Sequence, residues 1–176
     1  RMASASHTDV IPVDIGIAAS CKIDGVLDEK IACGTRNFAK EPAMTEKETL
    51  DAIDTGVRLV KQCKENGYQI LATGEMGIGN TTTSSAVTAA LLHSLASETA
   101  GRGAGLNDKG LSRKKQVIQE AIDRYDLYKA DAFTVLRTVG GLDIAGLTGV
   151  FIGGGMYHVP IVLDGLISGA AALIAR

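Results

Sequence analysis

The sequence has little of the material on which several classes of protein depend. It contains no tryptophan, and aromatic residues make up only 4% of the chain. The three cysteines, Cys21, Cys33 and Cys63, form no CxxC pair, which argues against a disulfide framework and against structural zinc. The net charge is −2 and the richest basic run is only 113–115, so no nucleic-acid partner is expected. No apolar run reaches ~18 residues, so no membrane-spanning helix is predicted. These features favour a globular protein with reduced thiols in the cytoplasm.

Glycine, in contrast, is in excess, with 21 residues in a chain of 176, or about 12% against a usual ~7%. Hydrophobic residues make up 45% and charged residues 22%, as in an ordinary globular domain. Two thirds of the glycines lie in three clusters, at 74–79, 101–110 and 140–155. Flexible linkers would scatter glycine more evenly. The clusters therefore predict loops that bend sharply or that let a ligand approach the backbone.

Alternating and helical patterns of apolar residues predict an α/β protein. A capping box at Thr45 and Glu48 starts one helix, which is expected to end at Asn66-Gly67. The glycine-rich helix that follows 140–141 is expected to pack closely against a neighbour. Strands that alternate with helices, one of them almost wholly apolar, predict a parallel sheet covered on both faces. The predicted strands are 11–17, 68–73 and 159–163, and the predicted helices are 45–66, 81–95, 111–125, 129–139, 143–157 and one after 165.

The strongest local motif is the segment 74–82, GEMGIGNTT, which follows a predicted strand and opens a predicted helix. Glycines at a helix N-terminus let a phosphate approach backbone amides, and the helix dipole favours the anion. The alternative is a tight turn in which glycine satisfies geometry alone. Glu75, at the carboxyl end of the strand, points to a ligand crevice or is a solvated loop residue. Asn80 and Thr81 are expected to cap the helix, and their side chains also lie within reach of a ligand.

Other candidates lie further along the chain. The loop 101–105 is a second candidate for binding phosphate or sugar, and Lys114 follows it on a helix with a charge suited to phosphate. Asp143 is expected to act mainly as a helix cap. Asp164 follows the strand 159–163 and is expected at the same sheet edge as Glu75. The isolated histidines predict no metal site.

Five collinear segments together resemble the nicotinate-nucleotide:dimethylbenzimidazole phosphoribosyltransferase family. The similarity covers nearly all of residues 10–176 and is far more specific than one glycine turn. The segments are 34–39 (GTRNFA), 42–45 (PAMT), 74–82 (GEMGIGNTT), 139–147 (VGGLDIAGL) and 160–165 (PIVLDG).

The resemblance implies a three-layer, Rossmann-like α/β domain with a mostly parallel sheet, which assembles as a homodimer. It implies transfer of phosphoribose from nicotinate mononucleotide to 5,6-dimethylbenzimidazole or a related base, giving α-ribazole phosphate and nicotinate for the lower ligand of cobamides, with no metal or other cofactor. Glu75 matches the family's active-site glutamate. The residues expected at the substrate are Gly77, Ile78, Gly79, Asn80, Thr81, Gly103, Lys114, Asp143 and Asp164.

The chain also departs from the family. Residues 1–9 read as linker residues or residues foreign to the natural chain, and 10–176 as the central nucleotide-binding portion of a longer domain. The family's general-base glutamate lies in a glycine-rich motif beyond the matching region. Glu75 is therefore expected to position or stabilise, and the chain is expected to be a catalytically incomplete fragment. Two alternatives stay open: the same fold with another azole or a phenol as acceptor, and a non-catalytic nucleotide-binding module or partner subunit.

Overall fold

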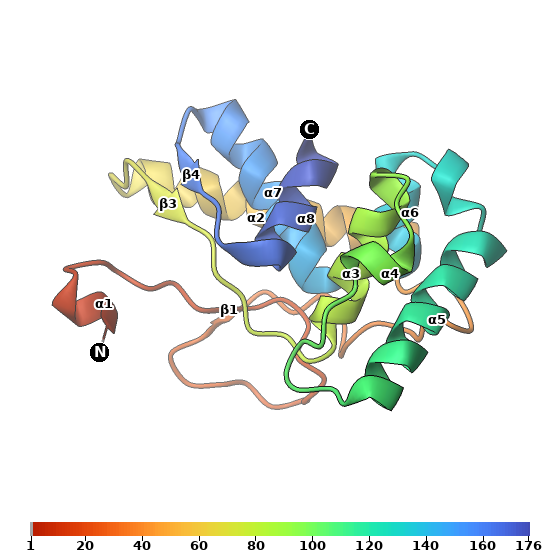
Figure 1. The fold of residues 1–176 in the computed structure, drawn as a ribbon. Helices are drawn as coiled ribbons and strands as arrows, with labels where there is room; N and C mark the ends of the chain where they lie inside the picture. The colour runs from red at the N-terminus through yellow and green to blue at the C-terminus, as the bar shows by residue number, and fades with distance from the viewer. Residues whose placement is uncertain (1) are drawn as a thin grey trace.

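The computed structural model describes residues 2–176 and is built mainly of helices (Figure 1). Arg1, the first residue of the predicted linker segment, lies outside the described residues. The elements run in the order α1 (Met2–Ala5), β1 (Val13–Asp14), β2 (Leu27–Asp28), α2 (Glu46–Glu65), β3 (Leu71–Ala72), α3 (Asn80–Leu91), α4 (Ala96–Thr99), α5 (Asp108–Arg124), the 3-10 turn η1 (Leu127–Lys129), α6 (Ala132–Val139), α7 (Leu142–Tyr157), β4 (Ile161–Val162) and α8 (Gly165–Ala175).

The strands are parallel, which confirms the predicted α/β class. β1 pairs with β2, and β3 pairs with β4 in the register Leu71 to Ile161. Within residues 2–176 the strands form two separate pairs, and each strand is only two residues long, much shorter than the sequence predicts. The expectation that 159–163 is buried on both faces was wrong, because Val162 and Leu163 are 49% and 48% exposed. No helix in this part of the chain has the length and apolarity needed to cross a membrane.

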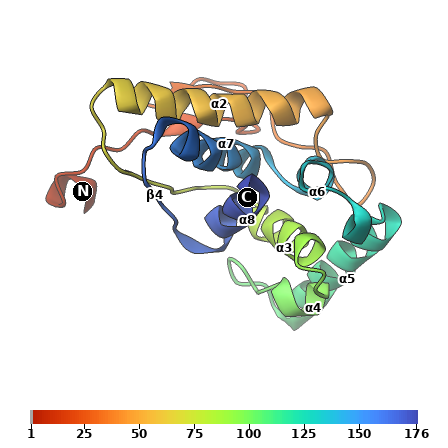
Figure 2. The same ribbon diagram turned by 90° about the horizontal axis from the view of Figure 1, so that it is seen from above.

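The core forms where α2, α7, α8 and α3 stack on one another. Figure 2 shows α2 lying along α7, with α8 and α3 on the opposite side of α7. α2 and α7 approach so closely that a Cβ at Gly149 would lie 1.9 Å from the carbonyl oxygen of Ile53, and one at Gly56 would lie 2.1 Å from that of Gly146. The predicted close packing of the glycine-rich helix is therefore confirmed. This stack fixes where the N-terminus of α7 lies.

The N-termini of the helices show which of the caps predicted from the sequence are present. The capping box of α2 is present, with Thr45 and Glu48 bonded reciprocally. α3 and α7 instead begin behind glycines. Gly79, in the left-handed region at φ 84°, is the N-cap of α3, and Gly141 is the N-cap of α7. The expectations that Asn80 or Thr81 caps α3 and that Asp143 caps α7 were therefore wrong. The side chains of Asn80 and Asp143 have other partners, described below.

Candidate active site

Lys114 is a buried cation at the centre of the first half of the site. It lies on α5 with 6% of its surface exposed. Its Nζ donates to the hydroxyl of Thr81 and to the carbonyl of Gly101, each at 3.0 Å. Across the described residues, no carboxylate lies within ion-pair distance of this Nζ. Burial lowers the pKa of Lys114, since a low-dielectric setting disfavours the charged form. A buried cation without a counter-ion is costly, so the site is suited to an incoming anion.

The second glycine loop closes onto this lysine. Gly103 is in the left-handed region at φ 57°, and a Cβ there would lie 2.7 Å from the Thr81 hydroxyl. Thr81 is the second residue of α3, so its hydroxyl stands at the positive end of that helix dipole. The structure thus brings together Gly103, Thr81 and Lys114, which are far apart in the sequence.

The second half of the site is a pair of carboxylates joined by an amide. The Nδ2 of Asn80 donates to an oxygen of Glu75 and, at 2.9 Å, to Oδ2 of Asp143. Asn80 is 7% exposed, whereas Glu75 lies exposed in the glycine loop after β3. Because Asn80 opens α3 and Asp143 stands in the first turn of α7, the N-termini of both helices meet here. The site therefore presents a buried ammonium, which is hydrogen-bonded to Thr81, and a carboxylate pair, which is hydrogen-bonded to Asn80, the preceding residue of α3.

Two glycines make room for this pair. A Cβ at Gly77 would lie 2.5 Å from Nδ2 of Asn80 and 2.9 Å from Oδ2 of Asp143. A Cβ at Gly141 would lie 2.6 Å from Oδ1 of Asp143. Gly141 was not among the predicted site residues, although it lies in the glycine cluster 140–155. At position 79, by contrast, a Cβ would meet no atom within 4 Å, so it is the positive φ alone that favours glycine there.

The remaining predicted residues lie around this centre. Asp164 follows β4 as Glu75 follows β3, and these strands are parallel, so both residues belong to the same edge of the pair. Asp164 is exposed and, in the described structure, its side chain makes no cap bond to α8. Ile78 is 102% exposed and Met76 is 93% exposed, so the glycine loop presents two free apolar side chains. Within residues 2–176 no group of three or more His, Cys, Asp or Glu is arranged to hold a metal.

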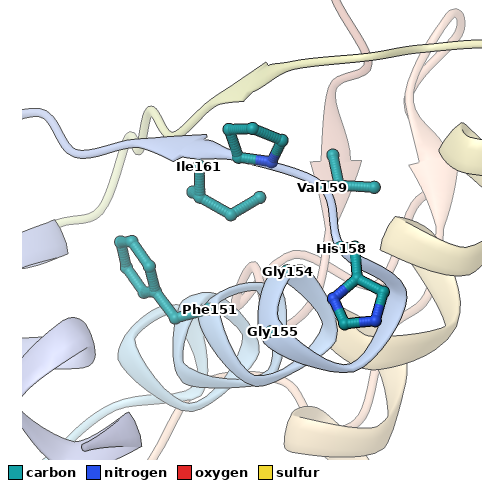
Figure 3. Close-up of a pocket in the computed structure, with 7 residues that line it drawn as sticks. Phe151, Gly154, Gly155, His158, Val159 and Ile161 are labelled. Atoms are coloured by element: carbon teal, nitrogen blue, oxygen red, sulfur yellow. The ribbon is translucent and has the colours of Figure 1, made fainter.

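An apolar cavity of about 500 Å³ lies elsewhere (Figure 3). Phe151, His158 and Ile161 line it, at the C-terminal end of α7 and the start of β4. Asp143 stands at the opposite end of α7, which is roughly 24 Å long at 1.5 Å per residue. None of the predicted site residues lines this cavity, so it is separate from the carboxylate and lysine site.

Comparison with known proteins gives consistent matches along the whole chain. A family profile described as "Phosphoribosyltransferase" matches residues 1–176. Two relatives named nicotinate-nucleotide–dimethylbenzimidazole phosphoribosyltransferase come from Clostridium perfringens strain 13 and Ruminiclostridium cellulolyticum. The first is 42% identical over 175 residues, covering 99% of this chain and 48% of the relative. The second is 47% identical over 170 residues, covering 97% and 48%.

Solved structures agree with these relatives. The crystal structure of CobT from Thermus thermophilus superposes with a TM-score of 0.92 at 36% identity. The superposition covers 98% of this chain and 52% of that one. The chain thus spans about half the length of the curated relatives it matches.

Proposed function

The chain belongs to the nicotinate-nucleotide:dimethylbenzimidazole phosphoribosyltransferase family, and on that basis we propose that the whole protein is a pentosyltransferase. It takes phosphoribose from nicotinate mononucleotide and passes it to 5,6-dimethylbenzimidazole or a related base. The products are α-ribazole phosphate, nicotinate and a proton. One observation carries the proposal: a buried lysine that has no carboxylate partner among residues 2–176 contacts Thr81, and a carboxylate pair contacts the adjacent Asn80, at the start of α3.

The lysine end is suited to the 5′-phosphate. An ammonium has three donors, and Lys114 uses two of them on Thr81 and Gly101, which leaves one for a ligand. The N-terminus of α3 adds its dipole, and the left-handed conformation of Gly103 brings the second loop onto Thr81. We propose that the phosphate binds here, with backbone amides near Gly79 and Gly103 as further donors.

The carboxylate end is suited to the sugar. When the bond between C1′ and the nicotinate nitrogen breaks, its electron pair leaves with nicotinate and positive charge develops on the ribose. A fixed negative group stabilises such charge more in the transition state than in the ground state. We propose that Glu75 does this, while an azole nitrogen attacks C1′ from the opposite face and its proton passes to a base other than Glu75. Asp143, Asp164 and Ile78 border the same site in this proposal.

Nicotinate release tests the proposal. The whole protein is incubated with nicotinate mononucleotide and 5,6-dimethylbenzimidazole, and nicotinate and α-ribazole phosphate are quantified by chromatography. We expect both products in equal amounts and a strongly reduced rate for Glu75→Gln. Glu120→Gln is the control, because Glu120 is exposed on α5 and bonds only to Gln116 in the described structure. No nicotinate release with any azole or phenol would reject the transferase and favour a non-catalytic nucleotide-binding module.

Family membership further leads us to propose that the whole protein works in the cytoplasm as a homodimer. Light scattering coupled to size exclusion tests the assembly. A mass equal to that of one whole chain at micromolar concentration would reject the dimer.

A further inference from the structure

Asn80 joins two carboxylates that are far apart in the sequence. Its amide nitrogen donates one hydrogen to Glu75, five residues earlier, and the other to Asp143, 63 residues later. An asparagine amide has two N–H donors, so both are used within the protein and neither is left for a phosphate. Asn80 is also 7% exposed, so water does not readily replace these bonds.

The surrounding backbone is shaped for this bridge. Gly77 and Gly141 come from different loops. A Cβ at Gly77 would collide with the bridging atoms, Nδ2 of Asn80 and Oδ2 of Asp143, and one at Gly141 would collide with Oδ1, the other carboxylate oxygen of Asp143. Two carboxylates bonded to one nitrogen repel each other unless positive groups face them. The two amide hydrogens of Asn80 are such groups, and the N-termini of α3 and α7 add partial positive charge. The Nζ of Lys114 is hydrogen-bonded to Thr81, the residue that follows Asn80.

Glu75 depends on the bridge because, among the described residues, only Asn80 bonds to its side chain. It stands exposed in a loop that contains three glycines, so its side chain would otherwise sample many rotamers. We propose that Asn80 is a positioning residue. It orients the Glu75 carboxylate toward the sugar and holds the charged carboxylate of Asp143 next to it. This inference rests on the proposed transferase function and assigns Asn80 a role on the protein side of the site. A residue held in the reacting geometry before substrate binds costs no reorganisation during the reaction.

Steady-state kinetics of the whole protein separate positioning from binding. Asn80→Ser keeps a polar side chain but cannot reach both carboxylates. We expect kcat to fall by about 10- to 100-fold, with the KM for nicotinate mononucleotide within about twofold of wild type. The control Thr88→Ala removes a hydroxyl further along α3 that has no hydrogen-bond partner in the described structure, and it should leave both constants unchanged. A rise in KM with an unchanged kcat would overturn the proposal, because Asn80 would then hold substrate.

A double-mutant cycle tests whether Asn80 acts through Glu75. If it does, adding Asn80→Ser to Glu75→Gln should change kcat by less than about twofold, although it is harmful in the wild type. Rate losses that multiply would overturn the inference. Circular dichroism of each variant shows whether it folds.

Nuclear magnetic resonance tests the bridge without turnover. In the ¹⁵N-labelled chain, the side-chain NH₂ signals of Asn80 should move in Glu75→Gln and again in Asp143→Asn, and stay in place in Thr88→Ala. NH₂ signals that ignore both carboxylate variants would overturn the bridge even in an active enzyme. Absence of turnover alongside responsive NH₂ signals would reject the proposed function and leave the bridge established.

Discussion

Replacing Lys114 with methionine removes a buried positive charge and keeps an unbranched side chain of similar length. Lys114 is 6% exposed, so its ammonium reaches a bound phosphate with little competition from water. A hydrogen bond to a charged group contributes about 1.5–3 kcal/mol, and each ~1.4 kcal/mol is a factor of ten in affinity. Lys114→Met should therefore weaken binding of nicotinate mononucleotide by about 10- to 150-fold.

The folded chain should tolerate this change. Burial disfavours the charged lysine, so removing it offsets the bonds lost at Thr81 and Gly101. We expect the urea midpoint of Lys114→Met to equal or exceed that of wild type at neutral pH. Because burial lowers the pKa of Lys114, the unfolded chain binds more protons than the folded one. Wild-type stability should therefore rise as the pH increases through the folded pKa toward 10.5, and Lys114→Met should lack this rise.

Isothermal titration calorimetry of the chain with nicotinate mononucleotide measures the effect. Arg113→Met is the control, because it removes the same charge from an exposed position on the neighbouring face of α5. It should change the affinity by less than about threefold, as expected for a solvent-screened charge. An affinity of Lys114→Met within twofold of wild type would refute the assignment of the phosphate to this lysine. A loss of affinity that accompanies unfolding would refute the reasoning on stability.

Three further predictions concern the scaffold. Gly149→Ala should lower the free energy of urea unfolding by about 3 kcal/mol or more, because the new Cβ would collide with the Ile53 carbonyl. Gly155→Ala on the same helix should raise it by about 0.5–1 kcal/mol, because a Cβ there would meet no atom within 4 Å. Equal effects of the two changes would contradict the packing argument. The ion pair with Arg36 lowers the pKa of Glu48 to about 2 from 4.5, so its stabilisation is complete above pH 4.5 and is lost as the pH falls toward 2. Glu48→Gln should flatten that decline in urea midpoints, and an unchanged slope would contradict the ion-pair assignment. Thr45→Ala should cost about 1 kcal/mol by removing the N-cap of α2, and no loss of thermal stability would show that the cap contributes nothing.

The sequence by itself determined the features whose partners lie within a few residues. The capping box of α2 joins Thr45 to Glu48, three positions away, so its pattern can be read directly. The glycine turn at 74–79 and the family resemblance likewise depend on residues that are contiguous in the sequence. These signals gave the helices, the α/β class and the loops where a ligand is expected.

Packing of distant elements decided the rest. Three of the strands were predicted from their apolar patterns, and β2 was not. In each strand only two residues pair with a neighbour, because hydrogen bonding depends on the partner strand. Asn80 was expected to cap α3, whereas its side chain bonds to a carboxylate 63 residues away. Lys114 lies 33 residues from Thr81, and its burial depends on how α5 packs. Local sequence patterns do not predict such contacts. They form only when helices pack through their apolar faces and thereby bring distant polar side chains together.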